Sequence, residues 1–570
     1  MLPVLAACAA DAADASVPIR LNQLGFLPAA HKLAVAPTNA EDRFVVEDAA
    51  TGKVVLTGRL GAAAAWEPAG DSVRIADFSA LGAPGRYRLR IDGLPPSDEF
   101  VVAADAYAGL AAASVKAFYF NRAGTALEPR HAGLYARAAG HPDDAVRIHA
   151  SAASATRPEG TLISAPKGWY DAGDYNKYIV NSGIATWTLL AAWEAFPQVF
   201  AAQRLDIPES GDGAPDLLHE VWWNLEWMLA MQDPADGGVY HKLTTLQFEG
   251  FVMPADAKRP RYVVQKSTAA ALDFAAVMAR ASRVYAPYEK QFPGAGKRML
   301  AAARAAWNWA QAHPQAFYRQ PADVGTGAYA DDRLDDEFAW AAVELFKATN
   351  GESRFRPFEL IGRIGPGVPS WGNVGGLAWM GLVDRRADDP TLPESEHKDR
   401  EQAFVAFADG LLRQWHDSAY RVAMRGPDFV WGSNAQALNQ AMVLVEAYRL
   451  TQRRDFLDAA QSQLDYVLGR NPLGRSFVTG FGARPPLHVH HRPSAADGIP
   501  APVPGWLAGG PNPRQQDARG CSGKPYPSQL PALSYIDEAC SYASNEVAIN
   551  WNAPLVYVAA ALQALTPVAQ

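Results

Sequence analysis

The hydrophobic pattern of this chain changes period once, near residue 105, and that change divides the sequence into two kinds of fold. Before it, residues 86–91 (RYRLRI) alternate polar and apolar side chains, as a half-buried β-strand does. Further short strands are expected at 54–56, 73–75 and 100–102, with Gly- and Pro-containing turns between the runs. Several short strands within residues 16–104 predict a small all-β sandwich.

After residue 105 apolar residues recur every three to four positions, as on one face of an α-helix. Leu217, Val221, Leu225 and Met228 share such a face. Gly/Pro-rich loops, of a length that often carries function, separate the helices. Residues 105–570 are therefore predicted to form an all-α barrel or solenoid, in which 470–535 is the longest stretch without helical period. Further helices are expected at 107–120, 184–196, 267–285, 297–312, 337–348, 404–415, 438–448, 454–468 and 547–565.

Length and charge limit the class of protein. With 570 residues the chain is too long for one ordinary core, so two or more domains are expected. A formal charge of -8 without a basic stripe argues against a nucleic-acid partner. No apolar run approaches the ~20 residues of a membrane span. Aromatic residues make up 10% of the chain, which suits stacking on sugars, although any single aromatic is more often part of a core.

The three cysteines bear on the compartment. Cys8 follows Leu5-Ala6-Ala7, an arrangement that resembles a bacterial lipoprotein cleavage box with a lipid anchor, so residues 1–15 are interpreted as a lipoprotein or plain export-signal remnant. Both interpretations predict a secreted, periplasmic or outer-surface protein. Cys521 and Cys540 can pair in an oxidising compartment and are otherwise two free thiols.

Two segments contain carboxyl groups suited to acid–base chemistry. Asp171 and Asp174 flank a flexible Ala-Gly pair among aromatic residues, as a general base that activates water at a sugar ring requires; alternatively, they make turn hydrogen bonds. Glu546 precedes the last predicted helix, where the helix macrodipole favours ionisation. A general acid would instead need desolvation by Tyr542 or Trp551, or a nearby carboxylate.

Two further clusters contain potential ligands. Residues 488–492 (HVHHR) suit either a metal ion or hydrogen bonds to a polyhydroxyl substrate. The acidic run 331–337 suits Ca²⁺ or a solvated helix start. A nucleotide-binding glycine loop after a strand, a zincin pair and a nucleophile elbow are all missing from the sequence.

Several of these segments resemble motifs of glycoside hydrolase family 9. Residues 171–174 (DAGD) are similar to that family's catalytic-base motif, and 544–552 (SNEVAINWN) are similar to its catalytic-acid motif. Residues 490–492 match its substrate-binding His-His-Arg. Residues 334–340 and 430–434 are also similar, and 19–26 resemble the immunoglobulin-like module that precedes many bacterial members. The motifs occur in the family's order over nearly the whole chain.

The resemblance implies an immunoglobulin-like sandwich followed by an (α/α)6 barrel, and single-displacement hydrolysis of β-1,4-glucans. It places Asp174 as the base, Asp171 as a second carboxyl that helps to hold the water, and Glu546 as the acid. Inversion would set the Asp174 and Glu546 carboxyls about 6.5–9.5 Å apart. Asp537 is expected to raise the pKa of Glu546 by its negative charge. Sugar-contacting positions fall on His490, Arg492, Asp537, Tyr542, Trp431 and Trp169.

The resemblance also bears on metal ions, none of which catalysis would use. Relatives hold a structural zinc through two Cys and two His, but the matching positions here are Ala123, Gly140, His141 and His149, so no zinc is expected. A structural calcium is expected at Asp332, Asp336 and Glu337, although Gly372 stands where a further Asp belongs.

The first functional hypothesis is an endo-acting β-1,4-glucanase that cuts cellulose, cellooligosaccharides or mixed-linkage β-glucan. Exo action, as a cellodextrinase, β-glucosidase or exo-β-glucosaminidase, is a second, favoured if 470–535 closes one end of the cleft. A glycan-binding protein without activity is the third, and the joint presence of Asp171, Asp174 and Glu546 argues against it. The chain is expected to act as a monomer. A disulfide between Cys521 and Cys540 would stiffen the loop that leads to the acid.

Overall fold

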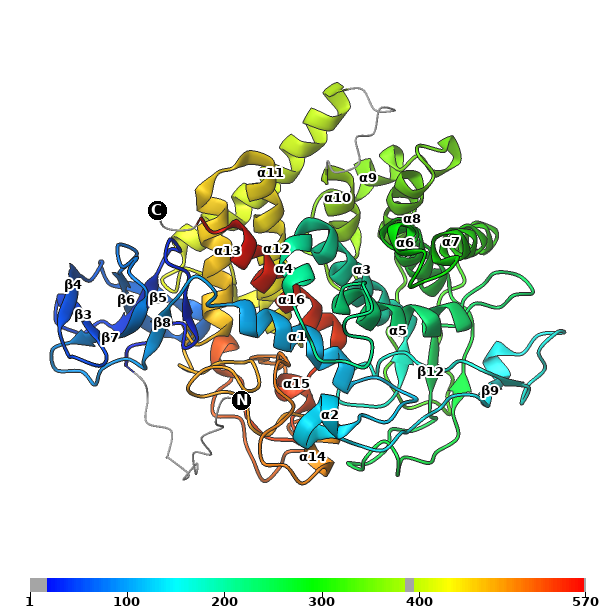
Figure 1. Cartoon of the computed structure of the whole chain (residues 1–570), viewed down its shortest axis with the longest axis horizontal. Helices are drawn as coiled ribbons and strands as arrows, with labels where there is room; N and C mark the ends of the chain where they lie inside the picture. Colours follow the sequence, from blue (N-terminus) through cyan, green and yellow to red (C-terminus); the bar gives the residue numbers. More distant parts are fainter. Residues whose placement is uncertain (1–17, 385–393, 568–570) are drawn as a thin grey trace.

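A β-sandwich lies at one end of the molecule and a larger helical domain forms the rest, in this computed structural model (Figure 1). The structure describes residues 18–384 and 394–567. Cys8 and the export-signal interpretation of residues 1–15 lie outside the described residues. The last strand of the sandwich ends at Val102 and the first helix begins at Ala108, so the change of hydrophobic period coincides with a change of fold.

The sandwich is built from two sheets, with strand orders β1–β8–β7–β3–β4 and β2–β6–β5. In β7 the residues Tyr87, Leu89 and Ile91 face inward and the arginines between them face solvent, as the alternating sequence predicts. Phe26 packs edge-on against Phe78 and Phe100 in the core between the sheets. The strands are β1 (Gly25–Phe26), β2 (Leu33–Pro37), β3 (Arg43–Asp48), β4 (Val54–Arg59), β5 (Ala64–Trp66), β6 (Asp71–Asp77), β7 (Gly85–Ile91) and β8 (Phe100–Val102).

The helical domain contains a series of helices in which each packs on the next. The series runs α3, α6, α8, α10, α12 and α16, and α16 packs on α3 again; α1, α5, α7, α9, α11 and α13 each lie against a member of it. These helices are α1 (Ala108–Phe120), α3 (Ile179–Ala195), α5 (Asp216–Ala230), α6 (Thr268–Tyr285), α7 (Ala295–Ala312), α8 (Asp335–Ala348), α9 (Phe358–Ile364), α10 (Gly375–Val383), α11 (Glu394–Asp417), α12 (Ser433–Thr451), α13 (Arg454–Val467) and α16 (Ile549–Leu565).

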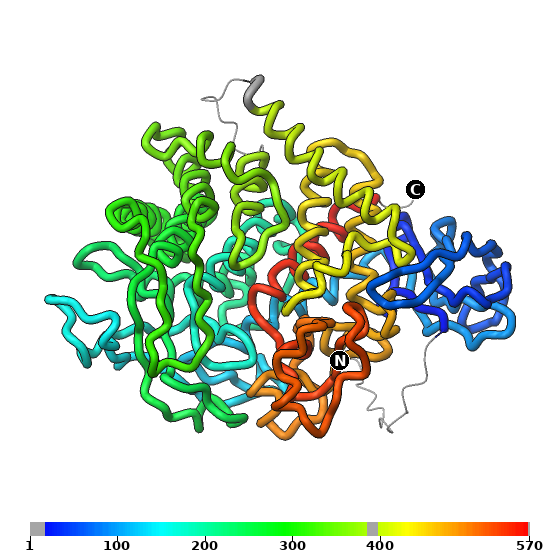
Figure 2. Tube along the Cα trace, turned by 180° about the vertical axis from the view of Figure 1, so that it is seen from behind, coloured from blue at the N-terminus to red at the C-terminus, as the bar shows by residue number. Residues whose placement is uncertain are grey.

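Loops, short helices and a small sheet gather at one end of these helices (Figures 1 and 2). The sheet has the strand order β10–β9–β13–β12–β11. It provides a rigid base for the loops that follow its strands. Its strands are β9 (Val146–Ile148), β10 (Leu162–Ile163), β11 (Lys177–Tyr178), β12 (Lys242–Thr244) and β13 (Tyr262–Val263), and the short helices are α2 (Pro129–Ala132), α14 (Arg492–Ala496) and α15 (Tyr542–Asn545). A further short helix, α4 (Pro197–Ala202), follows the other end of α3.

The observed helices differ from the sequence-based expectations at several boundaries, and two of the differences concern α10 and the segment that carries Glu546. Helix α10 was not expected, because its first turn contains Gly375 and Gly376, which favour loops on propensity alone. The last helix begins at Ile549 rather than at 547, so Glu546 does not lie in its first turn. For α10, packing against α8 explains why the segment that begins with Gly375 and Gly376 is helical.

The sandwich packs closely on the helical domain. Trp66, which is almost fully buried, lies 4.6 Å from Tyr420 and 6.1 Å from Phe429 between ring centres. Asn22 donates a hydrogen bond of 2.9 Å to Asp465, both buried. The module therefore shares part of its core with the helical domain, as a packing partner does.

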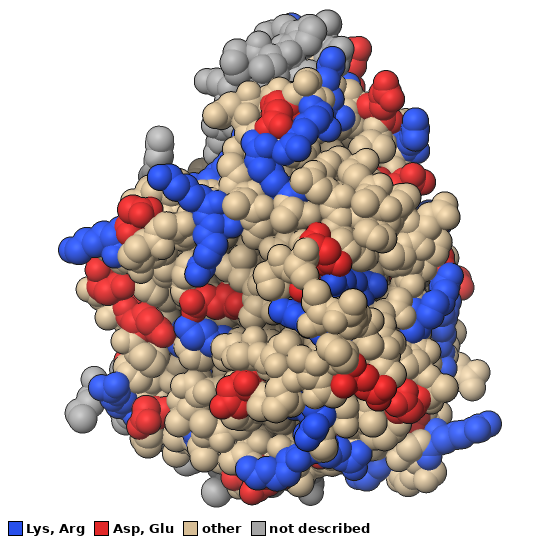
Figure 3. All heavy atoms as spheres, turned by 90° about the vertical axis from the view of Figure 1, so that its right-hand side faces the viewer, with Lys and Arg blue, Asp and Glu red and all other residues tan. Residues whose placement is uncertain are grey.

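Basic and acidic side chains are interspersed on the face shown in Figure 3. Among the described helices, none has the length and apolar composition needed to cross a membrane. Cys521 and Cys540 form a disulfide that closes a loop with a sequence separation of 19 residues.

Candidate active site

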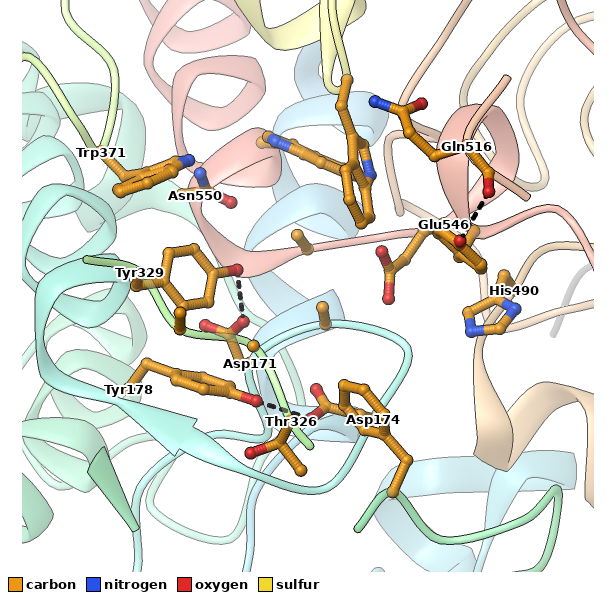
Figure 4. Close-up of a pocket in the computed structure, with 18 of the residues that line it drawn as sticks. Asp171, Asp174, Tyr178, Thr326, Tyr329, Trp371, His490, Gln516, Glu546 and Asn550 are labelled. Carbon is orange, nitrogen blue, oxygen red and sulfur yellow. Dashed lines mark hydrogen bonds between the residues drawn. The ribbon is translucent and has the colours of Figure 1, made fainter. Parts of the chain in front are cut away.

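A cavity of about 780 Å³ opens among the loops and short helices, and the three candidate catalytic carboxyls line it (Figure 4). Its other walls come from segments far apart in the sequence. They include Ala172, Tyr178, Phe248, residues 325–329, Trp371, Val430, Trp431, His490, Arg492, Arg514, Gln516, Tyr542, Ala548, Asn550 and Trp551.

Asp171 is held rigidly at the floor of this cavity. Its backbone carbonyl accepts a hydrogen bond of 2.9 Å from the amide of Ile549, which ties the loop to the start of α16. Its Oδ1 accepts a hydrogen bond from Asn181 at 2.6 Å, and its Oδ2 accepts one from the Tyr329 hydroxyl at 2.8 Å. Burial, and then the charge of Asp174, raise the pKa of Asp171 to about 8.

Asp174 lies beside it, and its hydrogen bonds are gathered on one carboxylate oxygen. The Tyr178 hydroxyl donates to Oδ2 at 3.1 Å, and the side-chain amide and backbone amide of Asn176 donate to the same oxygen. None of these bonds falls on Oδ1, which leaves that oxygen to accept a proton. Because two neighbouring buried carboxyls do not ionise together readily, Asp171, whose pKa is raised, is the member of the pair that holds a proton.

The turn between the two aspartates needs a glycine. A Cβ built on Gly173 would lie 2.2 Å from the backbone oxygen of His490, so the two segments approach too closely for any side chain. Arg492 stabilises this close approach through two hydrogen bonds. Its Nη1 donates to the Gly173 carbonyl at 2.6 Å, and its Nε donates to the Glu249 carbonyl at 2.9 Å. Arg492 lines the cavity and also fixes the loop that carries Asp174.

Glu546 reaches the cavity from an extended segment between α15 and α16. The Gly509 amide donates to its backbone carbonyl at 2.8 Å, and residues 490 and 546 pair as a parallel bridge. The side chain is partly exposed where it lines the cavity, and one oxygen accepts a bond of 3.3 Å from the Gly173 amide. Desolvation, followed by the charge of Asp174, raises the pKa of Glu546 well above its usual range. Glu546 is therefore the protonated partner of an ionised Asp174.

Three of the predicted sugar contacts lie on the same wall. The Nδ1 of His490 donates to the Ala539 carbonyl at 2.7 Å, and burial lowers the pKa of His490 to about 4, so its ring is neutral at neutral pH. Trp431 stays 43% exposed and packs on Tyr542 with 5.3 Å between ring centres. An exposed aromatic face at the rim of a cavity with acid–base groups is the arrangement that sugar rings stack on.

Two of the predicted contacts, Trp169 and Asp537, do not line the cavity. Trp169 has no exposed surface: it packs on Phe118 and donates to Glu220 at 2.7 Å, so it belongs to the core and has no face for a sugar. Asp537 does not line the cavity. It pairs with Arg475 at 2.7 Å, which neutralises its charge, so the raised pKa of Glu546 comes from burial and Asp174 instead.

Asp537 instead holds the segment before His490. Its carboxylate accepts hydrogen bonds of 2.9 Å from the backbone amides of Leu487 and His488, and one of 3.0 Å from the side chain of Asn545. It thereby joins the His-His-Arg segment to the residue that precedes Glu546. Asp537 therefore supports the site by holding the backbone of this segment.

Of the three expected calcium ligands, the side chains of Asp336 and Glu337 interact with each other, and Asp332 lies apart from them. Asp332 is exposed and pairs with Arg319 at 2.6 Å, Asp336 caps the Val374 amide at 2.8 Å, and Glu337 is buried. Within the described ranges no group of three or more His, Cys, Asp or Glu side chains is arranged to hold a metal ion. Asp332 therefore stays a prediction of the family resemblance, and in this structure its carboxylate pairs with Arg319 instead.

The positions that match the family's zinc ligands do not fit that metal. Ala123 and Gly140 carry no donor atoms. His141 contacts the Tyr170 hydroxyl through Nδ1 at 2.8 Å. His149 pairs with Asp323 at 3.1 Å.

The structure adds cavity residues that the sequence analysis did not single out. Tyr329 and Trp371 form one aromatic wall, 5.0 Å apart between ring centres. Tyr329 has a backbone φ of 47°, in the left-handed region that a bulky residue seldom occupies. Phe248, Arg514 and Gln516 come from loops with no regular pattern. The aromatic–glycine character of 325–329 was a local signal, but its distance from Asp171 in the sequence hid its role.

An ionised carboxylate, a protonated carboxyl group and exposed aromatic faces around one cavity define a glycoside hydrolase. The chain belongs to glycosyl hydrolase family 9: the model of that family matches residues 107–559. The model of the cellulase N-terminal ig-like domain matches residues 14–95, which identifies the β-sandwich as immunoglobulin-like.

Named relatives share nearly the whole chain. A xyloglucan-specific endo-β-1,4-glucanase of Bacteroides ovatus is 46% identical, with 96% of this chain and 94% of that protein covered. Endoglucanase D of Acetivibrio thermocellus is 32% identical over 95% of this chain and 83% of its own length. A solved Bacteroides ovatus family 9 structure superposes with a TM-score of 0.89 at 43% identity, covering 96% of this chain and 99% of the other.

Proposed function

We propose that this protein is an endo-acting β-1,4-glucanase that hydrolyses its substrate with inversion of the anomeric centre. The observation that carries the proposal is the geometry of three carboxyl groups, Asp171, Asp174 and Glu546, that line one cavity. Glu546 holds a proton because it is desolvated and faces Asp174, while Asp174 accepts three hydrogen bonds on one oxygen. A protonated acid and an ionised base are the two states that a single-displacement hydrolysis requires at its start.

In this mechanism a glucan chain lies in the cavity with its rings against Trp371, Trp431 and the neighbouring aromatic faces. Asp174 takes a proton from a water molecule through Oδ1 as that water attacks the anomeric carbon. Glu546 gives its proton to the departing glycosidic oxygen, so the bond breaks without an alkoxide leaving group. Asp171, protonated and held by Tyr329 and Asn181, keeps a second negative charge away from the base.

The proposal includes a finer description of the fold. The series of helices that returns from α16 to α3, with an outer helix against each member, supports an (α/α)6 barrel whose loop end carries the cavity. We infer that the chain works as a monomer, because one chain supplies every residue used in the mechanism.

The proposed reaction uses only carboxyl groups and water, so it includes no catalytic cofactor. A structural calcium at Asp336 and Glu337 stays a prediction of the family resemblance, and it would need further ligands to move into place. Export from the cytoplasm is supported by the Cys521–Cys540 disulfide, because such bonds persist in oxidising compartments.

Product analysis on a defined series of cellooligosaccharides tests the proposal. Proton NMR during the first turnovers should show the α-anomer of the new reducing end, as inversion requires; the β-anomer would exclude single displacement. Activity should be compared on carboxymethylcellulose, mixed-linkage glucan and xyloglucan, because the Bacteroides ovatus relative is named for the last of these.

Endo action is tested by comparing loss of viscosity with release of reducing ends on carboxymethylcellulose. An endo enzyme lowers viscosity steeply for each bond that it cuts. Little loss of viscosity per reducing end would replace the endo assignment with exo action. Asp174→Asn is the control, since hydrolysis that survives it comes from a contaminant or from different catalytic residues.

A further inference from the structure

Lys242 carries a buried ammonium group directly behind the catalytic carboxyls. It has no exposed surface and lies on β12, opposite Tyr178 of the antiparallel strand β11. Its three ammonium protons go to neutral acceptors: Gln320 Oε1 at 3.2 Å, Thr326 Oγ1 at 3.0 Å and the Gly327 carbonyl at 2.6 Å. A buried cation with neutral partners is costly, so its retention calls for a carboxylate nearby whose charge it balances.

Asp174 is that carboxylate. The Lys242 Nζ lies 5.5 Å from the centre of the Tyr178 ring, and the hydroxyl of the same ring donates to Asp174 at 3.1 Å. One phenol therefore separates the ammonium from the base. Burial lowers the pKa of Lys242 to about 7, and the charge of Asp174 opposes that shift. At acidic pH Lys242 is therefore charged.

Lys242 also fixes the loop that reaches Asp171. It holds the Gly327 carbonyl, and the neighbouring His241 donates through Nε2 to the Ala328 carbonyl at 2.9 Å. The next residue is Tyr329, whose left-handed backbone places its hydroxyl on Asp171. A strained conformation persists only where its surroundings hold it, and the adjacent side chains of His241 and Lys242 do so here.

We propose that Lys242 is a positioning residue of the hydrolysis: its buried ammonium balances the charge of Asp174 across the Tyr178 ring, and it clamps the loop that presents Tyr329 to Asp171. The inference rests on the proposed function and adds a residue that contacts neither the substrate nor the reacting atoms. The charged and titratable groups around Asp174 and Lys242 are Asp171, Tyr178, His241, Tyr318, Glu546 and, beside Glu546, Arg492.

The test measures kcat/KM for a dinitrophenyl β-cellobioside as a function of pH. The acid limb is the part of this profile in which kcat/KM falls as the pH is lowered. The leaving group of this substrate departs without a proton, so the limb reports the base alone. Lys242→Met removes both charge and donor, and should move the limb up by about one pH unit, as expected for a unit charge one ring away. It should also lower kcat at least ~10-fold with little change in KM. Lys242→Gln should show the same upward shift of the acid limb as Lys242→Met, because it restores a hydrogen-bond donor without the charge. Lys242→Arg should return the acid limb to its wild-type pH, because it restores the charge.

Lys177→Met is the matched control. Lys177 is a buried lysine of the adjacent strand, but its ammonium pairs with Asp143 at 2.8 Å. Its loss should lower the melting temperature and leave the acid limb in place. Gln320→Met removes one hydrogen-bond acceptor of the Lys242 ammonium, so it should move the acid limb in the same direction by a smaller amount. This variant is measured instead of the Lys242 variants if those do not fold.

An unmoved acid limb in folded Lys242→Met, or in Gln320→Met if it is used instead, would overturn the inference, as would an equal shift in Lys177→Met. The proposed function would survive either result, because it fails only if the wild-type protein lacks glucanase activity or retains the anomeric configuration.

Discussion

Replacing Glu546 by Gln tests the central electrostatic argument. Burial and Asp174 keep this carboxyl protonated in the free enzyme, so Glu546→Gln exchanges one neutral group for another of nearly the same shape. The Gln oxygen can still accept the 3.3 Å bond from the Gly173 amide. At pH 6 the variant should be at least as stable as the wild type, because the unfolded wild-type carboxyl gains free energy by ionising and the amide does not.

Catalysis should respond very differently, because the amide has no proton to give. On cellooligosaccharides kcat should fall by about 10²- to 10⁴-fold, the usual contribution of a general acid, while KM stays nearly constant. On a dinitrophenyl β-cellobioside most of the activity should remain. Steady-state kinetics on both substrates and thermal unfolding at pH 6 measure these effects.

The contrary results are equally clear. An equal loss on both substrates would mean that Glu546 does not act as the acid. A large drop in melting temperature would mean that Glu546 is ionised and that its attraction to Arg492 stabilises the fold. Asp174→Asn is the matched variant, and it should lose activity on both substrates because every turnover needs the base.

Other parts of the structure lead to further predictions. The folded Asp171 keeps its proton up to about pH 8, whereas the unfolded carboxyl ionises near its ordinary pKa, so the free energy of unfolding of the wild type should fall between pH 5 and 8. Asp171→Asn has no such carboxyl and should lose less stability over the same range. Calorimetry at both pH values measures this, and parallel curves would contradict the raised pKa. Trp66→Ala should cost about 3–5 kcal/mol by emptying the interface with Tyr420 and Phe429, seen as a lower melting temperature with kcat at 25 °C unchanged. An unchanged melting temperature would mean that the module does not support the helical domain. The double Cys521→Ser, Cys540→Ser variant should lose roughly 3 kcal/mol through the freed loop, and a melting temperature equal to that of the wild type under non-reducing conditions would refute it.

Much of the fold could be predicted because its signals are local. The alternation at 86–91 and the helical face from Leu217 to Met228 each depend on neighbouring residues, and both became the expected elements, β7 and α5. The Gly-Gly start of α10 could not be predicted, since packing against α8 outweighs its low helix propensity.

The sequence by itself determined the two-part fold and the identities of Asp171, Asp174 and Glu546, because period and short motifs are properties of neighbours along the chain. Only the tertiary structure decided their protonation. In the structure Glu546 lies outside the first turn of the last helix, and Asp174 rather than Asp537 is the charge that raises its pKa. Trp169 is buried in the core. These outcomes depend on desolvation and on distances between segments hundreds of residues apart, and neither quantity is a property of a local stretch of chain.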